Sequence, residues 1–385
     1  MRNVYADNNA TTRVAPEVVE EMLPYFSELY GNPSSMHYFG GQVEKKLIEA
    51  REKVASLLNC DPSEIIFTSC GTESDSTAIQ GTVESYPYKK HIITTRVEHP
   101  AVLNLCRHLS KNGYKLTELT VDKKGCLDLS ELENAIVDNT AIVSIMCANN
   151  ETGVIFPIEE IGEIVKSKGA VFHCDAVQAT GKIPLDMSKC AIDLLSLSGH
   201  KLHAPKGIGA LYIRKGAKLT PFIIGGHQER GRRAGTENVP YIIGLGKASE
   251  LAMKHIEDGN TRIKALRDRL EKELLRRCTD SQINGDTEHR LPNTTNISFE
   301  FVEGEAILLL LSQKGIAASS GSACTSGSLE PSHVLRAMGI PFTFVHGSLR
   351  LSLSRYNNEE DIDYIIEHLP PIIERLREIS PFGKD

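Results

Sequence analysis

The sequence predicts an α/β protein with a large domain on a mostly parallel β-sheet and a second, smaller α+β domain. Between residues 60 and 215, short apolar runs alternate with amphipathic helical segments, which is typical of a parallel sheet with helices on both faces. Past residue 255 this alternation stops, and a long charged segment with helical periodicity leads into a mixed set of helices and strands. We therefore divide the chain into a large domain at residues 15–257 and a small domain at residues 1–14 plus 258–385.

The individual elements follow from the period and the length of each apolar pattern. Strand candidates are short runs rich in branched aliphatic residues, and helix candidates repeat apolar residues at the helical period. In the large domain we expect strands at Glu64–Thr68, His91–Thr95, Lys115–Leu119, Ala141–Ala148, Val171–Asp175, Leu194–Ser198 and Gly209–Arg214. In the small domain we expect helices at Asn260–Arg277, Gly304–Lys314 and Glu359–Ile379, and strands at Thr295–Phe301 and Ser348–Ser352.

Composition and charge exclude several classes of protein. Hydrophobic residues make up 41% and charged residues 24% of the 385 residues, as in an ordinary globular protein. The formal net charge of −7 gives no reason to expect nucleic-acid binding. Apolar stretches such as Ala306–Leu311 are too short to cross a bilayer, and the first residues lack the apolar core of a secretory signal. We expect a cytoplasmic protein with no nucleic-acid or membrane partner.

The nine cysteines do not follow the pattern of a disulfide framework or a metal site. Their number is odd and no Cys-x-x-Cys pair occurs, so we expect neither disulfides nor bound zinc. Most lie in apolar surroundings, as Cys147 does, and are expected to be inert core residues. Cys324 differs because it lies in a run of small polar residues at 319–328. Such a run is typical of an exposed loop, where a thiol can reach other molecules.

Lys201 is the most informative single residue, because it closely follows the apolar strand predicted at Leu194–Ser198. A partly buried lysine loses its proton more readily than a surface lysine, and its neutral amine can form a Schiff base with a carbonyl cofactor. His200 and His203 lie beside it. Taken alone, Lys201 could equally well be a residue that only ends a strand, so its interpretation depends on the other strand ends.

Polar residues also follow other predicted strands, at the sheet edge where open α/β sheets bind ligands. Gly71 and Thr72 open a helix after the first strand, and such a helix N-terminus binds phosphate, unless the hydroxyl only caps the helix. Asp175 ends another strand, where its carboxylate could hold a proton on a pyridine nitrogen or could cap a helix. Gln178, three residues further on, could donate to a phenolic oxygen.

Two further strand ends complete the set. His99, in a Val-Glu-His-Pro turn, could stack on a planar ring and move protons, although a histidine before proline is often structural. Asn150 could donate to the same ring or could simply form a turn. A lysine, an aspartate, a histidine, amide donors and a phosphate cradle are the groups that pyridoxal phosphate needs. The Gly207-x-Gly209 pair lacks a third glycine and precedes a strand, so we do not expect NAD.

The chain resembles the cysteine desulfurases of the NifS type, which are fold-type I pyridoxal-phosphate enzymes of the class V aminotransferase kind. The likeness runs from Asp7-Asn-Asn-Ala-Thr-Thr through Tyr30-Gly-Asn-Pro-Ser-Ser to Ser380-Pro and covers essentially the whole chain. The resemblance implies a homodimer that removes sulfur from L-cysteine and leaves L-alanine and an enzyme persulfide. It also implies sulfur supply for iron–sulfur cluster assembly of the nitrogenase-maturation kind, with a NifU-like scaffold protein as acceptor.

The resemblance assigns a role to each of the strand-end residues. The matches are Lys201 for the cofactor linkage, Asp175 and Gln178 for the ring nitrogen and ring oxygen, His99 and Asn150 beside the ring, Gly71, Thr72, Ser198 and His200 for the phosphate, and Thr236 for a phosphate contact from the other subunit.

Nucleophile and substrate-binding residues also match. Cys324 matches the catalytic cysteine, and Arg350, with Asn150 nearby, matches the group that binds the substrate carboxylate. A guanidinium forms a bidentate pair with a carboxylate, so Arg355 is a near competitor for that role.

Three alternatives to a cysteine desulfurase remain. A selenocysteine lyase would use the same groups, because selenium and sulfur differ little in size. Another enzyme of the class V aminotransferase fold would not need Cys324 in its polar run. A catalytically silent sulfur carrier would not need Lys201, Asp175 and Arg350 together.

Overall fold

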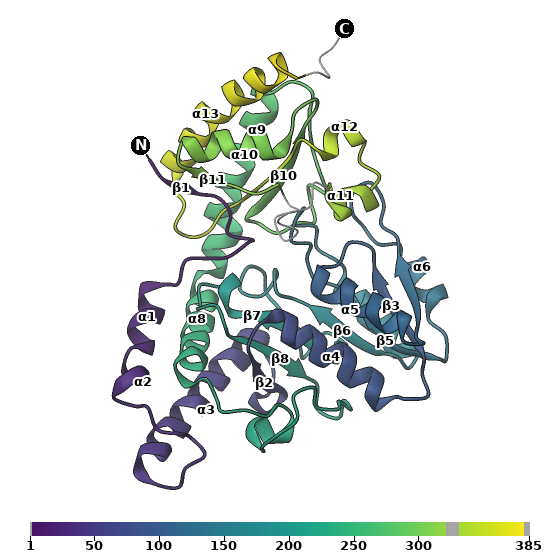
Figure 1. The fold of residues 1–385 in the computed structure, drawn as a ribbon, viewed down its shortest axis with the longest axis vertical. Helices are drawn as coiled ribbons and strands as arrows, with labels where there is room; N and C mark the ends of the chain where they lie inside the picture. The colour runs from purple at the N-terminus through teal and green to yellow at the C-terminus, as the bar shows by residue number, and fades with distance from the viewer. Residues whose placement is uncertain (1, 321–330, 381–385) are drawn as a thin grey trace.

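The computed structural model describes residues 2–320 and 331–380. A seven-stranded sheet with helices on both faces forms the larger part of the molecule, and a smaller group of helices and strands packs against one end of it (Figure 1). The predicted α/β class is therefore confirmed. Within the described ranges no helix is long and apolar enough to cross a membrane.

The large sheet is mostly parallel, as predicted. One strand, β8, runs antiparallel to both of its neighbours, β2 and β7. In spatial order the strands are β2 (Ile65–Thr68), β8 (Gly209–Ile213), β7 (Leu194–Ser198), β6 (Val171–Asp175), β5 (Thr140–Ser144), β3 (His91–Thr95) and β4 (Lys115–Leu119).

Both faces of this sheet are buried, because successive side chains of a strand point to opposite faces. Ile92 packs with the helices of one face, whereas its neighbour Ile93 packs into the larger core on the other face. The first face is covered by α4 (Gly71–Ser85) and α5 (Pro100–Lys111). The other is covered by α1 (Pro16–Met22), α3 (Tyr38–Leu58), α6 (Leu129–Ala135), α7 (Ile158–Ser167) and α8 (Val239–Asp258), with α2 (Pro24–Ser27) packed beside α8.

β5 is shorter than the predicted strand Ala141–Ala148 and ends at Ser144. Residues 145–148 stay close to β6, because Cys147 N donates to Asp175 O at 2.8 Å. The chain then turns back, and Ala148 pairs with Ile155 instead of with the sheet. This early departure places the Asn150 turn over the ends of the strands.

The predicted helix Asn260–Arg277 is the second half of a longer helical rod. α8 is followed by a π-helical turn at Gly259–Ile263 and then by α9 (Lys264–Arg277). The rod runs from the large sheet into the smaller group of elements (Figure 1).

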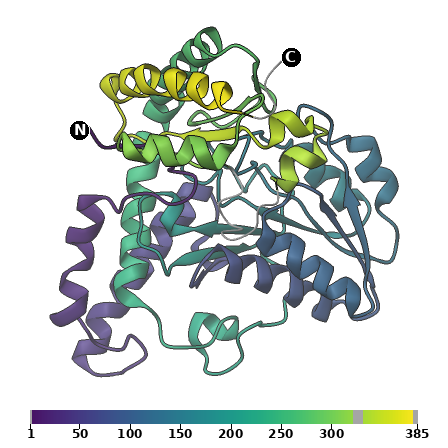
Figure 2. The same ribbon diagram turned by 45° about the horizontal axis from the view of Figure 1, so that its top comes forward.

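The smaller group has a core of its own, formed by apolar residues of α9, α10 (Gly304–Gln313) and α13 (Glu359–Glu378). α10 and α13 lie side by side over its strands (Figure 2). An antiparallel sheet has the order β12 (Ser348–Ser352), β10 (Thr294–Phe299) and β9 (Ser281–Ile283), β1 (Val4–Tyr5) pairs with β11 (Ile316–Ala317), and α11 (His333–Ala337) and α12 (Phe342–Val345) complete the group.

Candidate active site

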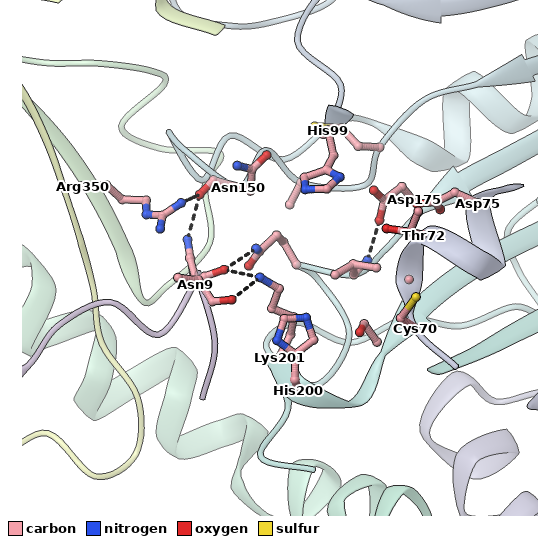
Figure 3. A pocket seen from close by; sticks show the side chains of 17 residues that line it. Asn9, Cys70, Thr72, Asp75, His99, Asn150, Asp175, His200, Lys201 and Arg350 are labelled. Carbon is pink, nitrogen blue, oxygen red and sulfur yellow. Dashed lines mark hydrogen bonds between the residues drawn. The ribbon is translucent and has the colours of Figure 1, made fainter. Parts of the chain in front are cut away.

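A cavity of about 330 Å³ opens at the carboxyl ends of the central strands (Figure 3). Segments far apart in the sequence meet there: the first ten residues, the start of α4, the ends of β6 and β7, and β12. The predicted site residues that line this cavity are Gly71, Thr72, His99, Asn150, Asp175, Gln178, Ser198, His200, Lys201 and Arg350.

Lys201 reaches the cavity from the 3-10 turn Gly199–Lys201 that follows β7. Its Nζ donates to the main-chain oxygen of Asn9 at 2.5 Å and to that of Ala10 at 2.7 Å. Figure 3 shows the amine directed across the cavity toward this N-terminal segment. The lysine therefore does more than end a strand, because its amine is held at the wall of a cavity.

Asp175 ends β6 and is buried, with 6% of its surface exposed. Burial raises the pKa of its carboxyl to about 6, while the Val177 N–H, which donates to Oδ1 at 2.9 Å, and the Lys201 amine act in the opposite direction. A cation placed against this carboxylate would keep it ionised at neutral pH.

His99 caps α5 and also lines the cavity, so its structural role as a cap does not prevent a role in the site. Its Nδ1 accepts from the Ala101 N–H at 3.1 Å, so the neutral ring carries its proton on Nε2. Burial and, to a smaller extent, the nearby Lys201 and His333 together lower the pKa of His99 to about 4. The neutral ring therefore offers a donor at Nε2, and accepting a proton there requires a tautomer that gives up the Ala101 bond.

The start of α4 fits a phosphate group. Cys70 occupies the N-cap position but its side chain makes no capping bond, so the first N–H groups of this 15-residue helix are not covered by the cap. A Cβ at Gly71 would lie 2.9 Å from Val177 Cγ2, so only glycine leaves the space open. Ser198 Oγ is buried in the cavity wall and has no hydrogen-bond partner among the described residues.

Arg350 lies at the opposite end of the cavity from α4 (Figure 3). Its guanidinium donates to Asp7 Oδ1 at 2.8 Å and to the main-chain oxygen of Asn150 at 2.9 Å. Its Nε is buried and has no partner among the described residues, so donor capacity remains for a ligand. Arg355, the competitor, lines a different cavity, behind Lys201. The geometry therefore favours Arg350 as the group that meets a carboxylate.

Among the residues that line the cavity, sequence reasoning assigned no role to Asn9 or Asp75. Asn9 accepts from Lys201 and, at 2.9 Å, from Gln178 Nε2 through its main-chain oxygen, and its own amide donates to Thr294 Oγ1. Asp75 follows Gly71 by one helical turn, so helical spacing could have identified it. Burial raises the pKa of Asp75 well above its usual value, and the Asp175 carboxylate acts in the same direction.

Two predicted residues remain: Thr236, which does not line this cavity, and Cys324. Thr236 is exposed in the segment before α8, three residues after Arg233, whose guanidinium pairs with Glu73 of α4 at 2.8 Å. Cys324 lies outside the described residues. Residues near both ends of the undescribed segment 321–330 are held by hydrogen bonds. Ser320 O accepts from Ser348 Oγ at 3.3 Å, and Ser332 Oγ donates to Glu151 Oε2 at 2.5 Å.

Comparisons with known proteins identify the family of this chain. The family described as aminotransferase class-V matches residues 4–365. A cysteine desulfurase of Trichormus azollae is 63% identical over 385 residues, which cover 100% of this chain and 96% of that protein. The cysteine desulfurase NifS of Azotobacter vinelandii is 58% identical over 383 residues, covering 99% and 95%. A solved NifS-like protein superposes with a TM-score of 0.92 at 42% identity, covering 97% of this chain and 100% of its own.

Fold and cavity thus define a pyridoxal-phosphate enzyme of the class-V aminotransferase type, and the cavity residues fit that cofactor. The chain belongs to this family and, within it, to the cysteine desulfurases of the NifS type. The family and the cofactor predicted from the sequence are therefore confirmed.

Proposed function

We propose that this protein releases sulfur from L-cysteine as a persulfide on Cys324, with L-alanine as the second product, and supplies that sulfur for iron–sulfur cluster assembly. One observation carries the proposal: Lys201, Asp175 and Arg350, from distant parts of the chain, line a single cavity. The names of the curated relatives support cysteine as the substrate, and NifS of Azotobacter vinelandii supports the link to nitrogenase-type maturation.

Pyridoxal phosphate, when bound, supplies a carbonyl that captures an amine and a ring that withdraws electrons from the substrate α-carbon. Lys201 would hold it covalently, and Gly71, Thr72, Ser198 and His200 would surround its phosphate. The Asp175 carboxylate would keep a proton on the ring nitrogen, because a buried carboxylate is most stable beside a cation.

Arg350 would bind the α-carboxylate of the substrate. It is held between Asp7 and the Asn150 carbonyl, so its orientation is set before a ligand arrives. Preorganisation of this kind lowers the entropy lost on binding.

The Cys324 thiolate would attack the substrate sulfur. A sulfur–sulfur bond forms and the carbon–sulfur bond breaks, its electron pair stays with the three-carbon fragment, and a proton completes alanine. Because only the thiolate is nucleophilic, a base is needed. His99 can take that role only in its other tautomer, as its Nδ1 is engaged by Ala101.

A homodimer completes the proposed enzyme, with Thr236 reaching the phosphate site of the partner subunit. Thr236 is exposed here and lies outside the cavity of its own chain, which supports a role across an interface. Large apolar side chains are also exposed and available to an interface, among them Met36 at 106% and Ile224 at 87%. A NifU-like scaffold is the proposed sulfur acceptor.

The test is product formation from L-cysteine in the presence of a thiol reductant, comparing wild type with Cys324→Ala. Equimolar alanine and sulfide should form with wild type and fall by at least about 10²-fold in the variant, because the nucleophile is gone. The half-buried Cys126 provides a matched control, and Cys126→Ala should behave as wild type.

Products that persist in Cys324→Ala would mean direct elimination and would remove Cys324 from the mechanism. Turnover of L-selenocysteine without turnover of L-cysteine, in wild type, would establish the selenocysteine lyase alternative instead.

A further inference from the structure

An ion pair lies in the first turn of α4, next to the residues proposed to hold the cofactor phosphate. Arg233 Nε donates to Glu73 Oε1 at 2.8 Å, and Arg233 Nη2 donates to Glu73 Oε2 at 3.2 Å. The two side chains are mostly buried, with 21% of the arginine and 9% of the glutamate exposed. The guanidinium therefore binds both oxygens of the carboxylate in a geometry that fixes its direction.

Glu73 takes over a role that a helix cap would normally have. Cys70 occupies the N-cap position without a capping bond, whereas Glu73 Oε2 accepts from the Ser69 N–H at 2.9 Å. A carboxylate in the first turn also suits the positive end of the helix dipole. Glu73 itself does not line the cavity, so it stabilises the helix start without occupying the space of a ligand.

The charge of Glu73 nevertheless opposes the binding of an anion at the same helix start. Glu73 follows Gly71 and Thr72 within a single turn of α4. Burial acts to raise the pKa of Glu73, but hydrogen bonds from Arg233 and Ser69 outweigh burial and lower the pKa, so the carboxylate is ionised at neutral pH. A phosphate monoester carries about two negative charges at this pH, and an uncompensated carboxylate so close would repel it.

The segment that carries Arg233 is also held to the large sheet by other bonds. Arg51 of α3 donates to both carboxylate oxygens of Glu229 at 2.7 and 2.8 Å. Arg230 Nη2 donates to the main-chain oxygen of Ile65 in β2 at 2.7 Å. Because these bonds anchor the segment without Arg233, the pair with Glu73 is not needed as an anchor, and its effect on charge stands out.

We propose that Arg233 is a positioning residue for the cofactor phosphate: it neutralises the Glu73 carboxylate and holds it away from the cavity, so that a dianionic group can bind at the start of α4. This inference rests on the placement of the phosphate at α4 in the proposed function. It explains how a helix start that contains a buried carboxylate accepts a second anion.

The experiment compares two ligands that differ only in the phosphate, pyridoxal phosphate and pyridoxal, by titrating full-length cofactor-free protein and following visible absorption. Arg233→Met should raise the Kd of pyridoxal phosphate about 10-fold or more and that of pyridoxal less than about threefold, because only the first ligand carries the charge that Glu73 repels. Arg232→Met, which removes the neighbouring cation of the same segment, is the matched control and should leave both Kd values near wild type.

A second change separates charge compensation from anchoring. The double variant Glu73→Gln with Arg233→Met lacks both charges, so its Kd for pyridoxal phosphate should return to within about threefold of wild type. Glu73→Gln alone keeps Arg233 and should bind pyridoxal phosphate at least as tightly as wild type. This single variant tests the proposal even if Arg233→Met does not fold.

Three outcomes would overturn the proposal: equal weakening of both ligands in Arg233→Met, a double variant that stays as weak as Arg233→Met, or weaker binding of pyridoxal phosphate in Glu73→Gln. Failure of the proposed function is distinguishable, because the titrations contain no L-cysteine. A protein that follows the expected pattern of Kd values but forms no alanine and sulfide would contradict the proposed function and leave the role of Arg233 standing.

Discussion

The floor and the rim of the cavity are held in different ways. In the floor, formed by His99, Asp175 and Lys201 at or after the ends of β3, β6 and β7, Asp175 and His99 each accept from an N–H two residues ahead, whereas the Lys201 amine bonds to Asn9 and Ala10, 192 and 191 residues away. The rim, formed by Asp7, Asn150 and Arg350, is held by bonds that span 343 and 200 residues. Two of the three floor residues are thus oriented by local chain geometry, whereas the rim depends on how the smaller group of elements packs on the large sheet.

Chemistry should fail most severely when the floor is changed. Asp175→Asn removes the carboxylate that would hold the ring proton, so we expect kcat to fall by about 10²- to 10³-fold while cofactor absorption persists. Asp186, which is outside the cavity, provides the control Asp186→Asn with near wild-type turnover. Activity within about tenfold of wild type in Asp175→Asn would show that the floor carboxylate is not needed for the chemistry.

Changing the rim should weaken substrate binding more than it slows the chemical step. Arg350→Lys keeps the charge but loses the planar fork that contacts Asp7 and Asn150, so KM for L-cysteine should rise about 10- to 100-fold. kcat should change less than KM. Steady-state kinetics of Arg355→Lys provide the matched control, with no change expected. An equal rise in KM in the two variants would show that Arg350 has no special role in binding the substrate carboxylate.

The smallest expected effect concerns a buried acid beneath the floor. Glu98 Oε1 accepts from Thr95 Oγ1 at 2.8 Å and from the Met146 N–H at 3.1 Å, and burial raises the pKa of its carboxyl to about 8. Between pH 4.5 and 8, the Glu98 carboxyl therefore carries a proton in the folded protein but not in the unfolded chain. The stability contributed by this proton is complete below pH 4.5 and is lost as the pH rises through 8.

Glu98→Gln has no such proton to lose, so its Tm relative to wild type should increase by about 2 °C or more as the pH is raised from 5 to 8.5. Thermal unfolding at several pH values measures this difference. Glu160→Gln, at an exposed position of α7, should show no such trend. A Tm difference that stays constant with pH would contradict a protonated Glu98.

Much of the floor was predictable from the sequence. Apolar runs bounded by polar residues identified the strands, and Asp175 and Lys201 stood out because polar residues directly after buried strands lie at the edge where ligands bind. The end of β5 was less predictable, because the turn back at residues 149–154 is stabilised by Asn149 Oδ1, which accepts from the Glu151 and Thr152 N–H groups.

By itself, the sequence determined the α/β class, the family, the cofactor and the residues at the strand ends. These depend on local periodicity and on motifs of consecutive residues. The sequence ranked Arg350 ahead of Arg355, and the tertiary structure supplies the geometric reason, since β12 pairs Arg350 with Asn296 and Arg350 lines the main cavity, whereas Arg355 lies beyond the end of the strand and lines a different cavity. Tertiary structure alone brought Asn9 to the cofactor lysine and Arg233 to Glu73. Such contacts join residues that are distant in sequence, and only the packing of the folded chain brings them within hydrogen-bond distance.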